Sequence, residues 1–211
     1  LDVLVNNAGI CIGASFEDTT DAIWERTFAV NVTSILRLSR AALELLKKSS
    51  SASIINLGSI MSDMAGPGLC AYGSSKHAVA GLSKAMAVDL GKYRITVNYL
   101  QPGSIITGLS KPFLDDPSFR EFWEKKAPMG RLGEAQDVAR AALFLATEDT
   151  RFVSGAGLLV DGAPGSISSW MLRKRPAANA RSPSRGSHRS WQRIPRAPSR
   201  AGAISESDRK G

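Results

Sequence analysis

Short apolar runs alternate along this chain with longer segments in which apolar residues recur every three to four positions. The short runs are typical of strands buried on both faces of a parallel sheet, and the longer segments have the period of helices. The alternation therefore predicts βαβ units and a parallel α/β sheet with right-handed crossovers. The expected strands are residues 1–5, 53–57, 94–100 and 157–161, and the expected helices are residues 20–46, 72–93 and 136–147.

Two segments depart from this simple alternation. The first helix is expected to break around Asn31, and residues 109–126 form a mixed stretch that favours short helices. The aromatic side chains of that stretch either form a lid over an apolar substrate or pack against the edge of the sheet. They are Phe113, Phe119, Phe122 and Trp123.

The charge of the chain divides unevenly along its length. The formal net charge is +8, but residues 1–170 hold 16 basic and 17 acidic side chains, whereas residues 171–211 hold 11 basic and 2 acidic ones. The second segment is rich in Arg, Ser and Pro and has no apolar period, so it cannot bury enough surface to offset its ordering entropy. We expect one domain over residues 1–170 and a disordered basic tail over 171–211, or a frame error in place of that tail.

Several classes of partner are disfavoured by the same composition. No apolar run approaches the roughly 18 to 20 residues of a membrane span, and the N-terminus has no signal-peptide zones, which predicts a cytoplasmic protein without a membrane partner. Cys11 and Cys70 lack a metal-ligand or CxxC spacing, so buried, reduced thiols and no metal site are expected. Nucleic-acid binding by the tail is disfavoured, because Trp170 and Trp191 alone offer stacking there.

Tyr72 and Lys76 are four residues apart at the start of an expected helix, so their side chains share one face. A neighbouring ammonium stabilises a phenolate, and we expect Lys76 to lower the pKa of Tyr72 from its ordinary value of about 10. Tyr72 could then exchange a proton with an alcohol or carbonyl oxygen. Ser59 follows a buried strand, at the edge where open α/β sheets place their ligands, and could bind the same oxygen. The alternative is that Tyr72 and Lys76 are two neighbouring side chains on the surface of a helix, without a role in catalysis.

An ordered set of motifs resembles the short-chain dehydrogenase/reductase family over residues 1–162. The set combines a strand-end NNAG, a helix asparagine, a serine followed by YxxxK, and a PG motif. Its members are Asn6, Asn7, Ala8 and Gly9; Asn31; Ser59 with Tyr72 and Lys76; and Pro102, Gly103, Ile105 and Thr107. The resemblance implies a Rossmann-type, doubly wound α/β fold and an NAD(P)-dependent oxidoreductase that interconverts a secondary alcohol and a ketone.

The resemblance also implies roles for these residues. Tyr72 would be the general acid/base, Ser59 would orient the substrate oxygen, and Lys76 would bind the nicotinamide ribose. Asn31 would anchor a water that leads protons from Lys76 to solvent. The implied cofactor is NAD or NADP, and its remaining contacts would come from Asn6, Ala8, Gly9, Pro102, Gly103, Ile105 and Thr107. A small alcohol or carbonyl compound would be the substrate, and the chain would form a dimer or tetramer.

Simpler interpretations exist for three of these features. Asn6 and Asn7 could be turn residues that end a strand, Asn31 a residue of a helix kink, and Pro102 with Gly103 an ordinary turn. His77 faces elsewhere on the helix and receives no role.

The sequence departs from the family pattern in three places. The glycine-rich TGxxxGxG turn and the strands around it, roughly 80 residues, are absent from these 211 residues, which implies N-terminal truncation. Gly58 stands where the family usually has a second serine before the catalytic one. Ala163-Pro164 stands where the family usually has another glycine, soon after which its chain ends. An alternative function is therefore a catalytically inactive fragment that acts as a subunit or binding module, with the edge of its first strand uncovered.

Overall fold

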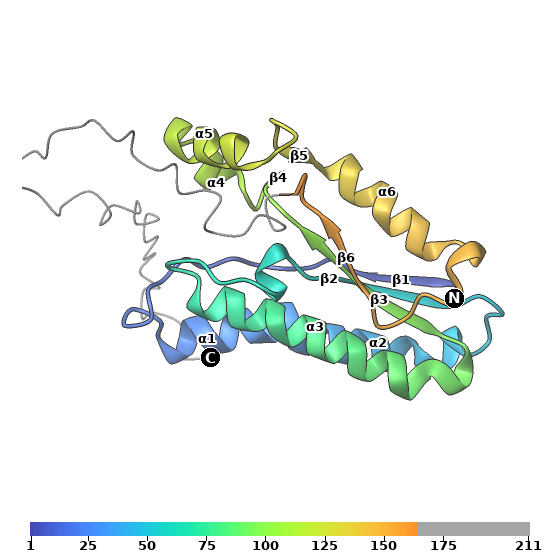
Figure 1. The fold of residues 1–211 in the computed structure, drawn as a ribbon. Helices are drawn as coiled ribbons and strands as arrows, with labels where there is room; N and C mark the ends of the chain where they lie inside the picture. Colours follow the sequence, from blue (N-terminus) through green and yellow to red (C-terminus); the bar gives the residue numbers. More distant parts are fainter. Residues whose placement is uncertain (164–211) are drawn as a thin grey trace, which may run out of the picture. The chain divides into compact units, whose positions relative to one another are not determined.

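The structure is a computed structural model, and it describes residues 1–163 of the chain (Figure 1). The expected disordered basic tail over residues 171–211 lies outside the described residues. So do residues 164–170 of the expected domain.

Four parallel strands form the central sheet in the order β1-β2-β3-β6 (Figure 1). This arrangement confirms the parallel α/β sheet and each of its expected strands. Their bounds are β1 Val3–Asn6, β2 Ser53–Leu57, β3 Thr96–Pro102 and β6 Gly157–Val160.

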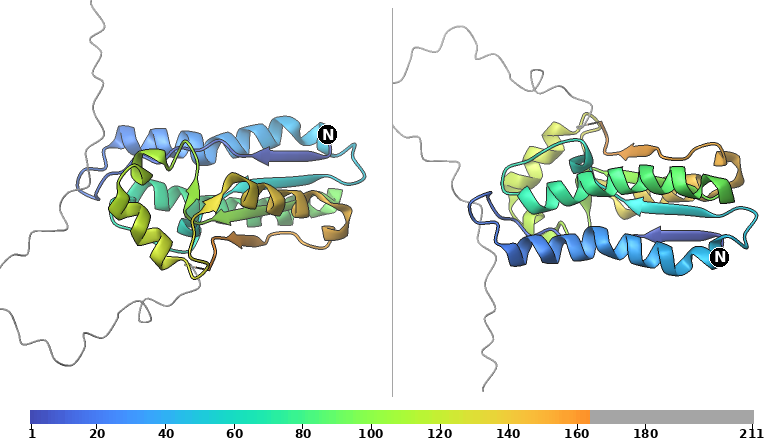
Figure 2. Two further views of the ribbon diagram at one scale, coloured as in Figure 1. Left: turned by 90° about the horizontal axis from the view of Figure 1, so that it is seen from above. Right: turned by 90° about the horizontal axis from the view of Figure 1, so that it is seen from below.

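Helices cover both faces of this sheet, as the two views of Figure 2 show. On one face lie α1 (Asp21–Phe28), α2 (Ser34–Leu46) and α3 (Cys70–Leu90), and on the other lies α6 (Ala135–Ala146). The break expected around Asn31 is a π-helical segment, η1 (Ala29–Thr33), that joins α1 to α2.

The alternating side chains of β2 divide the apolar core into two layers. Ile54 packs with Val79 of α3 and Ile35 of α2, whereas the next residue, Ile55, packs with Leu145 of α6. All five side chains are at most 2% exposed. Burial of each such side chain stabilises the fold by roughly 1.5 to 3 kcal/mol. This gain fixes the register of the strands against the helices.

The first strand differs from its expectation. Residues 1–5 were expected to be buried on both faces, but β1 lies at the edge of the described sheet and Val5 is 44% exposed. The reason is that, within residues 1–163, β1 pairs with β2 alone, so the apolar run is covered on fewer sides than a central strand.

Short elements complete the fold around the strand ends. The sequence did not predict the two-residue parallel pair of β4 (Ile105–Ile106) with β5 (Gly133–Glu134), because such short strands have no period. The short helices expected within residues 109–126 are confirmed as α4 (Lys111–Leu114) and α5 (Pro117–Lys126). The remaining elements are single 3₁₀ turns: η2 (Ile60–Ser62), η3 (Gly91–Tyr93) and η4 (Glu148–Thr150).

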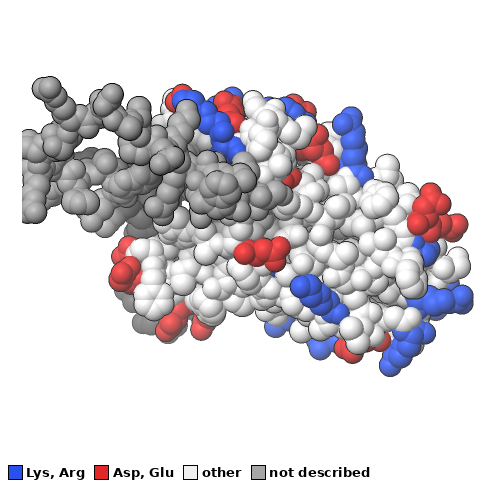
Figure 3. Space-filling view, in the orientation of Figure 1, with Lys and Arg blue, Asp and Glu red and all other residues white. Residues whose placement is uncertain are grey.

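Charged side chains of both signs are interspersed on the face of the molecule drawn in Figure 3. No helix within residues 1–163 is long and apolar enough to cross a bilayer. In the same part of the chain, no three His, Cys, Asp or Glu side chains come together as metal ligands would.

Candidate active site

The predicted site residues follow the carboxyl ends of three neighbouring strands. Because the strands are parallel, the segments after β1, β2 and β3 leave the sheet at one edge, and α3 begins beside them. The structure thereby brings together three segments that are about 40 to 50 residues apart in the sequence.

Ser59, Tyr72 and Lys76 meet at this edge. Ser59 forms a hydrogen bond with the Tyr72 side chain, and the Lys76 Nζ lies 5.7 Å from the centroid of the Tyr72 ring. Ser59 and Lys76 are 7% and 5% exposed, so both polar groups act in surroundings with little water. In such surroundings a hydrogen bond to a reacting oxygen is worth more than it is in bulk water.

The pKa values of this pair differ from the sequence expectation. Burial raises the pKa of Tyr72 to about 12, and the hydrogen bond from Ser59 lowers it by a smaller amount. Burial also lowers the pKa of Lys76 to about 8. The expected lowering of the Tyr72 pKa by Lys76 is therefore wrong for this structure, because loss of hydration disfavours the charged form of each group. Tyr72 is a neutral phenol at pH 7.

Lys76 is held in place by a backbone carbonyl. Its Nζ donates a hydrogen bond to the Leu57 carbonyl oxygen at 2.7 Å, at the end of β2. The loop after β1 passes close to the same ammonium: a Cβ added to Gly9 would lie 3.7 Å from Nζ and 3.6 Å from Asn31 Oδ1. Gly9 therefore leaves open a narrow space beside Lys76 that a side chain would fill.

Asn31 ties this loop to α3. Its Oδ1 accepts a hydrogen bond from the Ile10 amide at 2.8 Å, while its Nδ2 donates to the Ile10 carbonyl at 2.9 Å and to Ser75 Oγ at 3.0 Å. Asn31 is 1% exposed, so these bonds replace those it would make to water. A water contact at Asn31 stays a prediction.

The Asn6 side chain belongs to a buried polar network that sequence reasoning missed. Its Nδ2 donates to Ser39 Oγ of α2 at 3.2 Å and to Asn56 Oδ1 of β2 at 2.8 Å. Asn56 in turn donates to Ser83 Oγ of α3 at 2.9 Å. Since this network lies between the sheet and the helices, a cofactor contact by Asn6 would have to come from its backbone.

The segment after β3 makes two close approaches. A Cβ on Gly103 would lie 2.6 Å from Asp161 Cβ, and one on Gly133 would lie 2.3 Å from Ile105 Cδ1. Glycine is required at position 103, where the Asp161 backbone is also within 2.9 Å, whereas at position 133 only the movable end of the Ile105 side chain is so close. This structural requirement is compatible with either interpretation of the Pro102-Gly103 motif, a turn or part of a cofactor site.

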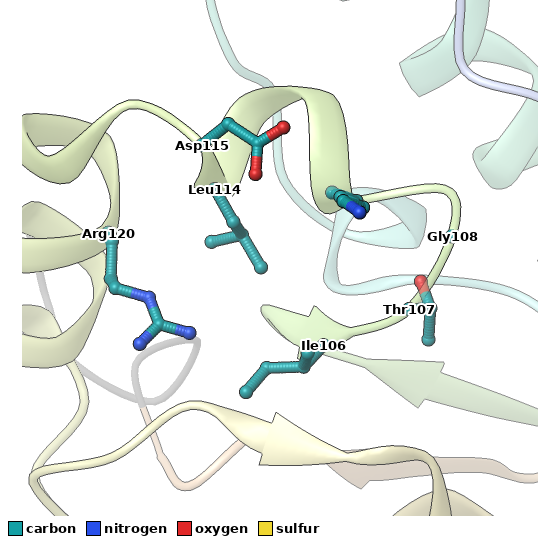
Figure 4. A pocket seen from close by; sticks show the side chains of 7 residues that line it. Ile106, Thr107, Gly108, Leu114, Asp115 and Arg120 are labelled. Carbon is teal, nitrogen blue, oxygen red and sulfur yellow. The ribbon is translucent and has the colours of Figure 1, made fainter.

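Thr107 lines an open pocket of about 560 Å³ beside α4 and α5 (Figure 4). Ser59, Tyr72 and Lys76 are not among its lining residues. Two cationic side chains and one carboxylate share the pocket with apolar groups. The lining consists of Ile106, Thr107, Gly108, Lys111, Leu114, Asp115 and Arg120.

The aromatic side chains of α4 and α5 pack on one another. Ring centroids are 5.8 Å apart for Phe113 and Phe119, 6.2 Å for Phe119 and Trp123, and 5.5 Å for Phe122 and Trp123. The Lys126 ammonium lies over the rings of both Phe122 and Trp123. Mutual packing thus accounts for these residues without a substrate, and a lid function stays a prediction.

Both cysteines are free thiols but are half-buried, where buried thiols were expected. Cys11 lies close enough to Lys76 to influence it electrostatically, and burial raises the pKa of the Cys11 thiol to about 11. Its place beside the site could not be predicted from spacing, because it depends on how the loop after β1 turns back.

Comparisons with known proteins agree with this geometry. The sequence model of a family described as enoyl-(acyl carrier protein) reductase matches residues 1–163. The chain is 39% identical over 162 residues to cyclopentanol dehydrogenase of Comamonas sp. and 40% identical over 162 residues to 2-dehydro-3-deoxy-D-gluconate 5-dehydrogenase of Bacillus subtilis. Each match covers 77% of this chain, and the chain spans 65% and 64% of the two relatives.

A solved structure also matches the fold. Gluconate 5-dehydrogenase from Burkholderia cenocepacia, in complex with NADP and tartrate, is 34% identical, and the match has a TM-score of 0.77. It covers 80% of this chain and 66% of that one. The likeness confirms the Rossmann-type α/β fold that the sequence predicted.

Proposed function

The chain belongs to the short-chain dehydrogenase/reductase family, whose cofactor is NAD or NADP, and we propose that it serves the interconversion of a secondary alcohol and a ketone. The observation that supports this reaction best is the meeting of Ser59, Tyr72 and Lys76 at the carboxyl edge of the sheet. The relatives' names describe dehydrogenases of alcohols and hydroxy acids, which are the same reaction type.

Tyr72 is the group that gives or takes the proton in this proposal. Since burial raises its pKa to about 12, the phenol is protonated at neutral pH and is ready to donate to a ketone oxygen. Ser59, already hydrogen-bonded to Tyr72, holds the same oxygen in place. The nicotinamide, when bound, supplies or accepts the hydride, so the protein contributes positioning and proton transfer.

Lys76 has two roles in the proposal. Its pKa of about 8 lets it pass a proton near neutral pH, toward the water that we propose at Asn31. Its Nζ, fixed by the Leu57 carbonyl, can also donate to a ribose hydroxyl.

The site fits the nicotinamide side of the cofactor. Gly9 places no side chain beside the Lys76 ammonium, and we propose that Lys76 and Tyr72 contact a ribose there. Other contacts would come from the backbones of Asn6, Ala8 and Gly9, and from the segment after β3. The proposed residues of that segment are Pro102, Gly103, Ile105 and Thr107.

We expect the 211-residue chain to bind NAD(H) or NADP(H) weakly, with a Kd above about 1 mM. The reason is that its sequence has no glycine-rich turn leading into a helix, the element that receives a pyrophosphate. Isothermal titration calorimetry with all four nucleotides measures this. Micromolar affinity for any of them would show that other residues bind the pyrophosphate.

A chimera tests the reaction itself. The segment of cyclopentanol dehydrogenase that precedes its aligned region is joined ahead of Leu1, because this relative is 39% identical and we propose that the segment supplies the glycine-rich turn. Oxidation of NADH and NADPH at 340 nm is then followed with a panel of cyclic ketones, keto acids and keto sugars. Turnover of any ketone supports the proposal. A folded chimera that binds cofactor but reduces none of them contradicts it.

The second candidate is a catalytically inactive subunit or binding module. The edge of β1 favours this candidate. Within residues 1–163, β1 pairs with β2 on one side only, so its other edge, together with the 44% exposed Val5, offers a surface to another chain. Under this candidate the chimera is inactive while the 211-residue chain still associates.

Assembly through α2 and α3 is the expected mode of oligomerisation. We propose that residues 33–48 and 72–92 supply the subunit contact, since apolar side chains on both helices are exposed: Leu36, Leu38 and Leu45 on α2, and Val88 on α3. Light scattering should give the mass of a dimer or tetramer. Leu38→Glu combined with Leu45→Glu should lower it toward the monomer, and a monomeric parent chain would contradict the assignment.

A further inference from the structure

Ser62 links the two segments that carry the proposed site. It is the last residue of η2, directly after β2, and it is 2% exposed. Its Oγ accepts a hydrogen bond from the Ser59 amide at 3.2 Å and donates one to the Lys76 carbonyl oxygen at 2.9 Å. One hydroxyl therefore joins the backbone of Ser59 to the backbone of Lys76.

Lys76 is consequently held at two points by the same segment. Ser62 contacts its backbone carbonyl, and Leu57 accepts the hydrogen bond from its Nζ. Leu57 and Ser62 flank Ser59 in the sequence, so the segment that presents Ser59 also fixes the turn of α3 that carries Lys76. Tyr72 lies one helical turn before Lys76, and its position follows from theirs.

Gly58 makes room for this arrangement. A Cβ at position 58 would lie 2.8 Å from Ser62 Oγ and 2.8 Å from the Leu100 carbonyl oxygen, both closer than real Cβ contacts allow. The Gly58 amide itself donates to that Leu100 carbonyl at 2.8 Å, which holds the backbone where it is. Glycine at this position therefore leaves the space that the Ser62 hydroxyl occupies.

We propose that Ser62 is a positioning residue, which sets the placement of Ser59 relative to Tyr72 and Lys76 through its two hydrogen bonds. The effect on turnover rests on the function proposed above. The effect on the environment of Lys76 does not, because it follows from the contacts of this chain alone. The two consequences can therefore be measured separately.

The first experiment measures the Lys76 side chain in the 211-residue chain by NMR titration of its ammonium group. The matched control is Ser83→Ala, because Ser83 is also fully buried and also makes two hydrogen bonds, to Val79 and from Asn56. We expect Ser62→Ala to raise the pKa of Lys76 by about half a unit or more, since a loosened turn admits water to the ammonium. Ser83→Ala should leave it unchanged.

Thermal unfolding separates positioning from general destabilisation. Both alanine variants should lose stability to a similar extent, because each removes a buried hydroxyl and leaves its hydrogen-bond partners unpaired. An unchanged Lys76 titration in Ser62→Ala, or an equal shift in both variants, overturns the proposal. If Ser62→Ala does not fold, Ser62→Cys, which fills the site but hydrogen-bonds weakly, takes its place with the same expected direction.

The second experiment measures turnover in the chimera. Ser62→Ala should lower kcat about tenfold and leave the KM for cofactor nearly unchanged, because misplacement affects proton transfer more than ribose binding. Ser83→Ala should keep both values, and Ser62→Thr, which retains the hydroxyl, should recover most of kcat. Equal kcat in Ser62→Ala and the parent overturns the proposal. An inactive parent chimera contradicts the proposed reaction, and the NMR titration then decides on Ser62 alone.

Discussion

Tyr72→Phe should reduce kcat of the chimera by at least about 100-fold, while the chimera still binds cofactor. The substitution removes one hydroxyl and keeps the ring, so the packing of α3 is preserved. A general acid contributes about 100- to 10,000-fold to a rate, and in this site no neighbouring group replaces the phenol: Ser59 is a far weaker acid, and the Lys76 Nζ is directed to the Leu57 carbonyl. Steady-state kinetics of ketone reduction, with calorimetry of cofactor binding, measures both quantities.

The matched control is Tyr93→Phe, at the exposed end of the segment that follows α3. It also removes one phenol hydroxyl, but far from the site, and should leave kcat unchanged. A Tyr72→Phe variant with more than about a tenth of the parent activity would mean that another group transfers the proton. The proposal that Ser59 and Tyr72 bind the same substrate oxygen would then also fail.

The sequence predicted the sheet well because each strand is a short, locally encoded apolar run. The expected bounds of β2, residues 53–57, agree with the structure, and the other strands agree within two residues. The helix break at Asn31 was visible for the same local reason. The two-residue pair β4–β5 was missed because its strands exist through the approach of two loops, at Ile105 and Gly133, rather than through any pattern of their own.

The sequence predicted that Ser59, Tyr72 and Lys76 would lie close together, but it did not predict their pKa values. YxxxK spacing places Tyr72 and Lys76 on one helix face, and a strand-end serine places Ser59 beside them. The pKa values, however, depend on the depth of burial, which spacing does not encode and which is the largest cause of the shift in both Tyr72 and Lys76. The hydrogen bonds of Ser62 and Asn56 were missed for a related reason, since a serine or asparagine in a sequence does not reveal which groups its side chain will contact.

Lys76→Met should make the folded 211-residue chain more stable at pH 7, and in the chimera it should abolish most turnover and weaken cofactor binding. Burial lowers the pKa of Lys76 from 10.5 to about 8, so below pH 8 the folded state carries an ammonium at a cost. A shift of that size corresponds to about 3 kcal/mol, from which the lost hydrogen bond to Leu57 subtracts about 1 to 2. We expect the free energy of unfolding to rise by about 1 to 2 kcal/mol, as measured by urea denaturation.

The pH dependence of stability identifies the source of that gain. Between pH 8 and 10.5 the unfolded chain binds the Lys76 proton and the folded chain does not, so the free energy of unfolding of the parent rises with pH. Cys11 and Tyr72 act in the opposite sense, because burial raises their pKa values from 9.0 to about 11 and from 10.0 to about 12, and their contributions are lost above pH 9 and pH 10. The window from pH 8 to 9 therefore reports on Lys76. Stability should rise there in the parent and stay level in Lys76→Met, and equal slopes in the two chains would show that the ammonium is not buried at a cost.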